Sequence, residues 1–95
     1  MVTAITLLQV RRDKINETAQ NLLDIPGVSE VYSVAGEWDL VTVLRCRDNE
    51  HLADVVTNHM LKHEPITKSE TLIGFRAYSR YDLDAMFDLG LEDGG

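Results

Sequence analysis

Apolar and polar positions along the chain follow two periods in turn, a period of two and a period near 3.6, which are typical of strands and helices. Strands are predicted in four runs rich in apolar and β-branched residues, at residues 3–11, 28–35, 40–47 and within 67–79, clearest at 71–78. Helices are predicted where apolar residues recur at helical spacing, from about residue 14 to a stop at residues 25–27, and over residues 50–62. Asp13 is the expected N-cap of the first helix, and Asp48 or Asn49 that of the second.

The order strand–helix–strand–strand–helix–strand predicts an α+β fold of the ferredoxin-like, or split β-α-β, type. In this fold a four-stranded antiparallel sheet carries two helices on one face. The first strand offers apolar side chains to both faces, with Ala4 and Leu8 on one side and Ile5 and Leu7 on the other. Because a bare apolar face of that size is unusual on a monomer, we expect a second copy to cover it in a twofold dimer.

Length and composition are those of one ordinary globular domain, with 95 residues, 44% of them hydrophobic and 26% charged. The net charge of −7 comes from nine bases and sixteen acids. Residues 1–81 carry nine bases and eleven acids, a net of −2, and the last fourteen residues carry the other five acids and no base. We therefore expect a folded domain over residues 1–80 and an acidic C-terminal extension over residues 81–95. The scarcity of bases argues against autonomous binding of nucleic acid or of an anionic membrane.

The start of the chain shows no basic segment followed by a long apolar stretch, and no apolar run approaches the roughly 20 residues of a membrane span. We therefore expect a cytoplasmic protein. The single cysteine, Cys46, cannot form an internal disulfide. It lies in a predicted strand between two arginines, and we interpret it as a buried core residue.

Few residues offer catalytic or metal-binding chemistry. His59 and His63 stand four apart, as two ligands on one helix do, but no Glu lies between them and Pro65 interrupts the helix nearby. His51 lies in the first turn of the same helix and is interpreted as a surface group. We predict no catalytic residue, no metal site and no cofactor.

The turn Gly36-Glu37-Trp38-Asp39, between the second and third strands, is the most informative candidate for binding. Gly36 permits a positive φ and lets a ligand approach the main chain. Free N–H groups in such a turn can hold a carboxylate, and Asp39 can pair with an ammonium group, which together suit a zwitterionic amino acid. A purely structural hairpin turn with a packed Trp38 explains the same residues, and composition alone favours it.

From Ala4 to about Ser79 the chain resembles the effector-binding domain of the leucine-responsive/asparagine-responsive (Lrp/AsnC) regulators, the regulation-of-amino-acid-metabolism (RAM) domain. The resemblance rests on three segments in this order: Ile25-Pro26-Gly27-Val28, residues 31–34 leading into Gly36-Glu37-Trp38-Asp39-Leu40, and Ile66-Thr67-Lys68-Ser69-Glu70-Thr71. The family usually joins this domain to an N-terminal winged helix-turn-helix, whereas this chain starts at the first strand. We therefore expect a stand-alone RAM protein without direct nucleic-acid contact.

The resemblance implies dimers that stack sheet against sheet as a dimeric α+β barrel and assemble further into tetramers or octamers. It places amino-acid effectors at the interfaces between dimers, near the hairpin. Carried over residue by residue, the ligand site comprises Gly36, Glu37, Trp38 and Asp39, with Ser69 and Thr71 presented by a neighbouring subunit. Many members have Tyr where this chain has Trp38, a difference that bears on the size and polarity of the ligand.

The function implied by the resemblance is an oligomeric amino-acid sensor without its own DNA-binding domain, which regulates transcription or metabolism indirectly. Full-length regulators of the same family are candidate partners. Two other interpretations stay open. Small dimeric α+β barrel enzymes, such as cofactor-free monooxygenases or isomerases, would need a histidine inside a cavity. ACT-like domains share the element order but bind ligand near the first strand-to-helix loop, here Arg11-Arg12-Asp13 without a glycine, and pair their sheets edge to edge.

Overall fold

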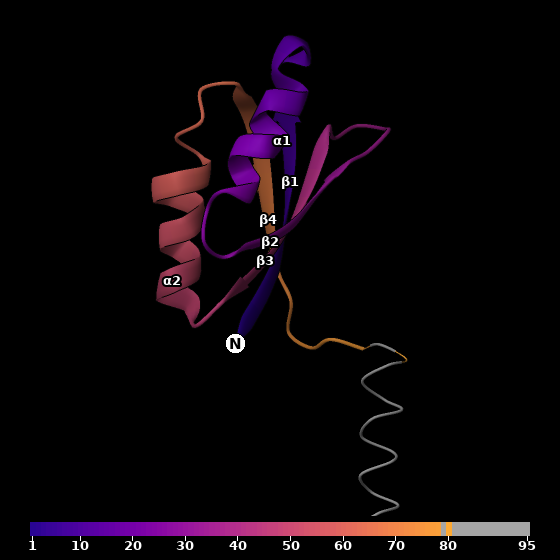
Figure 1. Cartoon of the computed structure of the whole chain (residues 1–95). Helices are drawn as coiled ribbons and strands as arrows, with labels where there is room; N and C mark the ends of the chain where they lie inside the picture. The colour runs from indigo at the N-terminus through magenta and orange to yellow at the C-terminus, as the bar shows by residue number, and fades with distance from the viewer. Residues whose placement is uncertain (79, 81–95) are drawn as a thin grey trace, which may run out of the picture.

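One antiparallel sheet, with its strands in the order β2-β3-β1-β4, forms one layer of the fold, and the helices form the other (Figure 1). The structure is a computed structural model that describes residues 1–78 and residue 80. The predicted ferredoxin-like order is confirmed, whereas the predicted acidic extension over residues 81–95 lies outside the described residues. The elements run β1 (Val2–Val10), a 3-10 turn (Arg12–Lys14), α1 (Ile15–Leu23), β2 (Val28–Ser33), β3 (Leu40–Cys46), α2 (Asn49–Asp54), a π-helical continuation (Val55–Met60) and β4 (Ile66–Ile73).

The register of β1 against its two neighbours determines which side chains form the core. Leu8 of β1 lies opposite Leu40 of β3 and Ser69 of β4. Because successive side chains of a strand point to opposite faces, every second residue of β1 faces the helices. These residues are buried, as are their counterparts on β3, namely Ala4, Thr6, Leu8, Val10, Leu40, Thr42, Leu44 and Cys46.

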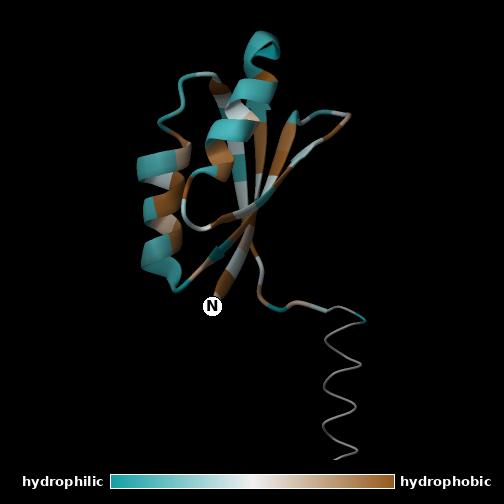
Figure 2. Ribbon diagram, in the orientation of Figure 1, coloured by the Kyte–Doolittle hydropathy of each residue, from teal (hydrophilic) through white to brown (hydrophobic). Residues whose placement is uncertain are grey.

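The helices close the core from one side only. Thr18 and Leu22 of α1 are buried, together with Leu52 of α2 and three residues of its π-helical continuation, Val55, Val56 and Met60. Figure 2 shows the corresponding division of each helix into a hydrophobic side and a hydrophilic side. No helix in the described part of the chain combines the length and the apolar composition that crossing a membrane requires.

The two predicted helix caps have different outcomes. Asp48 caps α2 as expected, and its Oδ1 accepts a hydrogen bond of 2.8 Å from the backbone N–H of His51. The prediction for Asp13 is wrong, because the chain makes a 3-10 turn at this point and α1 begins one turn later, at Ile15. The carboxylate of Asp13 instead lies 3.8 Å from Nε of Arg11.

The last strand begins earlier and ends earlier than its apolar pattern predicts. It spans Ile66–Ile73, so the segment 74–78 of the predicted strand lies outside it. Ile73 pairs with Ala4, close to the start of β1, and the N–H of Gly74 donates a final hydrogen bond of 2.8 Å to the carbonyl of Thr3. Beyond that point β1 has almost no residues left to pair with, and the chain turns away from the sheet.

The face of the sheet opposite the helices, called the open face below, is not covered by any of the residues that the structure describes. Its central residues are apolar, and Ile5, Leu72 and Tyr32 are exposed there. Charged side chains lie toward its edges. By register, the open face comprises Thr3, Ile5, Leu7 and Gln9 of β1, Glu30 and Tyr32 of β2, Val41, Val43 and Arg45 of β3, and Lys68, Glu70 and Leu72 of β4.

Candidate functional site

The hairpin between β2 and β3 contains four of the six predicted site residues. Gly36, at its tip, has φ = 125°, a conformation that L side chains rarely adopt. A Cβ at this position would meet no heavy atom within 4 Å. The backbone conformation, rather than a lack of space, is therefore what requires glycine, and the main chain at Gly36 is open to an approaching molecule.

Asp39 attaches the hairpin to β1 by backbone and side chain together. Its N–H donates a hydrogen bond of 2.9 Å to the carbonyl of Leu8, and its carbonyl accepts one of 3.1 Å from the N–H of Val34. Its Oδ2 accepts one of 2.8 Å from the backbone N–H of Val10. One carboxylate oxygen of Asp39 therefore holds the turn in place. This contact supports the interpretation of Asp39 as a structural residue of the hairpin.

Trp38 lies against a lysine of the opposite edge strand. Nζ of Lys68, on β4, lies 5.3 Å from the centroid of the Trp38 ring, within the range of a cation–π interaction. Nε2 of Gln9, on β1 between them, donates a hydrogen bond of 3.0 Å to the carbonyl of Glu37. The hairpin therefore folds back across β1 toward β4, and places a half-buried indole beside an ammonium group at one end of the open face.

Ser69 and Thr71 are not brought together with the hairpin side chains within one chain. By register they project on the helix side of the sheet, whereas the neighbouring Lys68 projects on the open face beside Trp38. The hydroxyl oxygens of Thr71 and the buried Thr6 lie 3.4 Å apart, so Thr71 lies on the helix side of the sheet, although Thr71 itself is exposed. Within a single chain, the six predicted residues form one cluster of four and a separate pair.

Gln9 and Lys68 belong to the surroundings of the site, and sequence reasoning missed both. Lys68 lay within a segment that carries the family resemblance, but its partner Trp38 is thirty positions away along the chain. Their contact depends on the register of three strands. The sequence signal that bears on this contact is the alternation of side chains along β4. It puts Ser69 and Thr71 on one face of the sheet and Lys68 and Glu70 on the other.

The three histidines occupy structural or surface positions. Nδ1 of His51 accepts a hydrogen bond of 3.0 Å from the backbone N–H of Arg47. Nε2 of His59 lies 3.4 Å from a carboxylate oxygen of Asp54, and a hydrogen bond from Asn58, with the nearby imidazole, lowers the pKa of Asp54 below its usual value. The cavity of about 390 Å³ at the far end of the sheet is lined by none of the three.

Cys46 lies in the core, as predicted. Its side chain is 1% exposed, and burial raises the pKa of its thiol above the ordinary value. A raised pKa keeps the thiol protonated and unreactive near neutral pH. Among the described residues, no group of three or more His, Cys, Asp and Glu side chains is arranged to hold a metal ion.

Comparison with known proteins supports the resemblance seen in the sequence. The Lrp/AsnC ligand binding domain family matches residues 2–83. The HTH-type transcriptional regulator LrpA of Pyrococcus horikoshii is 33% identical over 67 residues, which cover 70% of this chain and 48% of LrpA. The chain thus spans about half the length of this curated relative, and a smaller share of an uncharacterized HTH-type regulator of the same organism, at 39%.

Solved structures show the same fold. The protein TTHA0845 of Thermus thermophilus has a TM-score of 0.79 and 42% identity, and the match covers 84% of this chain and all of that one. A transcriptional regulator of Neisseria meningitidis, solved as an L-Met complex, has a TM-score of 0.75 at 16% identity. That match covers 83% of this chain and 53% of the regulator, and at such low identity it shows the fold alone.

Proposed function

Because the chain belongs to the Lrp/AsnC ligand-binding domain family, we propose that it is an oligomeric amino-acid-binding effector module rather than an enzyme. The observation that carries the proposal is the hairpin 36–39. It presents an open backbone at a positive-φ glycine, an aromatic ring and two carboxylate side chains in four consecutive residues, and the ammonium group of Lys68 lies 5.3 Å from the centroid of the ring. The L-Met complex of the Neisseria regulator, which shares the fold, is in line with such a ligand.

Each part of a free amino acid finds a complementary group at the hairpin. The α-carboxylate would bind backbone N–H groups near Gly36 and the ammonium group of Lys68, which already lies over Trp38. The α-ammonium group would pair with Glu37 and with Oδ1 of Asp39, because Oδ2 is held by Val10. The effector side chain would lie against the indole of Trp38. The electrostatic contacts recognise the zwitterion, and the ring sets the size of the side chain.

Ser69 and Thr71 join this site only through another subunit. Since their side chains project on the helix side of their own sheet, they complete a hairpin site only when a neighbouring molecule presents them. Effector binding would then be linked to assembly. A ligand that binds one assembly state more tightly shifts the population toward it, by no more than the difference between its two affinities.

The open face provides the surface for the basic dimer. It combines apolar side chains at its centre with charges of both signs toward its edges, including Arg45, Glu30, Lys68 and Glu70. Twofold stacking of two such faces would give the α+β barrel that the family resemblance implies. The same surface on a full-length regulator of the family would accept this chain, and in that way amino-acid binding would influence transcription indirectly. The matched relatives are HTH-type regulators.

No observation favours the enzyme alternative. Catalysis in a barrel of this type would need an acid–base group directed into a cavity. Of the described titratable side chains, only that of Arg76 lines the cavity at the end of the sheet, and an arginine that stays protonated is a poor general acid or base.

Isothermal titration calorimetry with each of the common amino acids, on the full chain, tests the proposal. We expect at least one to bind, with the oligomeric state followed in parallel by sedimentation velocity. Gly36→Ala and Lys68→Met should weaken this binding, whereas Lys62→Met, in the turn after the π-helical continuation of α2, should not. A complete absence of binding to both the dimer and larger assemblies would remove the sensor function.

A further inference from the structure

The side chain of Gln9 fixes the direction of one peptide group in the hairpin. Gln9 lies on the open face near the end of β1, and its Nε2 donates a hydrogen bond of 3.0 Å to the carbonyl of Glu37. The peptide bond between Glu37 and Trp38 is trans, so its C=O and N–H groups point in opposite directions. The N–H of Trp38 therefore points away from Gln9.

The backbone of Trp38 is held on both sides. Gln9 holds the peptide group that precedes it, and the hydrogen bond of 2.9 Å from the N–H of Asp39 to the carbonyl of Leu8 holds the one that follows it. Among the described residues, no group accepts a hydrogen bond from the N–H of Trp38 itself. The hairpin residues that precede it, 33–37, are exposed. Trp38 thus provides a backbone donor of fixed direction on an exposed turn.

The other two N–H groups of the turn are not held in this way. Those of Gly36 and Glu37 also have no acceptor within the described part of the chain, but neither do the carbonyls of Ala35 and Gly36, which share their peptide groups, receive a hydrogen bond there. A donor that is already oriented binds more tightly, because less conformational freedom is lost on binding. Of these three N–H groups, that of Trp38 is the one oriented in advance.

We propose that Gln9 is a positioning residue of the effector site, and that the N–H of Trp38, which it orients, donates the hydrogen bond that recognises the α-carboxylate. This inference rests on the proposed function, and it names the donor within that site. A carboxylate is the expected acceptor because the ammonium group of Lys68 lies 5.3 Å from the centroid of the Trp38 ring, and a hydrogen bond to an ionised acceptor is stronger than one to a neutral acceptor. Gln9 acts through the peptide group and does not itself contact the effector.

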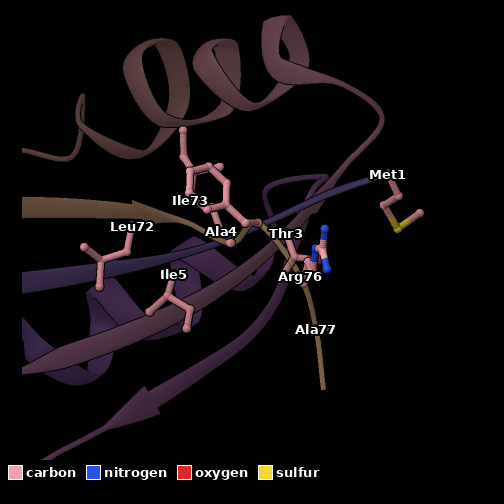
Figure 3. A pocket seen from close by; sticks show the side chains of 10 residues that line it. Met1, Thr3, Ala4, Ile5, Leu72, Ile73, Arg76 and Ala77 are labelled. Carbon is pink, nitrogen blue, oxygen red and sulfur yellow. The ribbon is translucent and has the colours of Figure 1, made fainter. Parts of the chain in front are cut away.

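The cavity of about 390 Å³ is a competing place for a carboxylate, because the side chain of Arg76 lines it. Figure 3 shows its walls, which come from the start of β1 and the end of β4, whereas Gln9 lies near the other end of β1. Neither Gln9 nor any residue of the turn 36–39 belongs to the lining. A change at Gln9 therefore affects binding at the hairpin and leaves binding in the cavity unaltered.

Gln9→Met removes the donor and keeps the length of the side chain. Calorimetry on the full chain, with the amino acid that binds the wild type best, should give a dissociation constant raised on the order of tenfold, as expected when a hydrogen bond to a charged group is weakened. Gln20→Met, at an exposed position of α1, is the matched control and should leave the constant unchanged.

Thr67→Val separates positioning from support of the fold. Oγ1 of Thr67 donates a hydrogen bond of 3.2 Å to the backbone carbonyl of Gln9, so the variant loosens the same end of β1 but keeps the Nε2 donor. We expect it to leave the dissociation constant close to that of the wild type. Equal losses of binding in Thr67→Val and Gln9→Met, or no loss in Gln9→Met, would overturn the positioning role.

The proton shift of the Trp38 backbone N–H gives a second readout. A new hydrogen bond to a carboxylate moves an amide proton downfield. Saturation with the amino acid should therefore move this resonance downfield in the wild type, and less in saturated Gln9→Met. Saturated binding without a downfield shift would overturn the inference and leave the proposed function intact, as would shifts confined to the cavity residues Ile5, Leu72 and Arg76 for the placement of the carboxylate. No binding of any amino acid would overturn the inference and the proposed function together.

Discussion

Asp39 and Val10 are joined by a hydrogen bond of 2.8 Å from a backbone N–H to a carboxylate oxygen, and this bond fixes the candidate site relative to the sheet. It lies at the point where the pairing of β1 with β4 shifts by a residue, between Gln9 and Val10. The turn that resembles a ligand-binding motif is therefore also a structural element. Changes to its residues should therefore affect the stability of the fold and the binding of a ligand to different extents.

Asp39→Ala should destabilise the fold by about 1.5–3 kcal/mol, the usual contribution of a hydrogen bond to a charged group. Asp39→Asn keeps an acceptor oxygen for the N–H of Val10 and should cost less. Urea unfolding monitored by circular dichroism measures both. Asp24→Ala, at an exposed position after α1, is the control and should have little effect. A loss for Asp39→Ala no larger than that for Asp24→Ala would contradict the structural role of the carboxylate.

Gly27→Ala should destabilise the fold more than Gly36→Ala, although both glycines have a positive φ, 102° and 125°. Backbone strain alone is expected to cost about 1–3 kcal/mol at either position. A Cβ at Gly27 would also lie 3.1 Å from Cγ2 of the buried Val55, whereas one at Gly36 meets nothing. Thermal and urea unfolding give the ranking. D-alanine at position 36, introduced by chemical synthesis, should restore stability, because it prefers positive φ; failure to do so would refute the strain argument.

Lys68→Met should change the fluorescence of Trp38, the single tryptophan of the chain, because it removes the ammonium group 5.3 Å from the ring. The loss of the cation–π interaction should cost about 0.5–1 kcal/mol of stability at this exposed position. Lys62→Met leaves the surroundings of Trp38 unaltered and should leave its emission unchanged. If both variants emit like the wild type, the two side chains do not stay in contact in solution.

Cys46 should make the stability of the fold depend on pH in the alkaline range. Burial raises the pKa of its thiol above the ordinary value of 9.0, so the folded state binds the proton more tightly than the unfolded state. The stabilisation is complete below pH 9.0 and is lost as the pH rises through the higher pKa of the folded state. The unfolding free energy of the wild type should therefore fall above pH 9 more steeply than that of Cys46→Ala. Parallel pH profiles would contradict this assignment.

The fold follows from the sequence because its strands and helices have clear periods. In β1, Ala4, Thr6 and Leu8 alternate with Ile5 and Leu7. This alternation predicts a strand between a helix layer and a second apolar surface, and the helix layer is confirmed. The boundary of β4 could not be predicted in this way. Phe75 continues the apolar pattern, but the strand ends where β1 runs out of partners, which is a property of register rather than of composition.

The candidate site, like the fold, could be predicted from the sequence only in part. Gly36 and Asp39 are recognisable because a positive φ and a turn carboxylate have specific residue preferences. The contact of Trp38 with Lys68 cannot be recognised in the sequence, because it depends on a hairpin that folds across an intervening strand. The separation of Ser69 and Thr71 from the hairpin appears only once register assigns their side chains to a face.

Chemical-shift mapping of the ¹⁵N-labelled chain tests the central claim, that the hairpin binds an amino acid, most directly. Spectra are recorded while the amino acid that binds best by calorimetry is added. The largest changes should fall on the N–H groups of residues 36–39 and on the indole N–H of Trp38, and Gly36→Ala should reduce them at the same amino-acid concentration. Binding with shifts confined to other parts of the chain, or no shifts at any amino-acid concentration, would contradict the account.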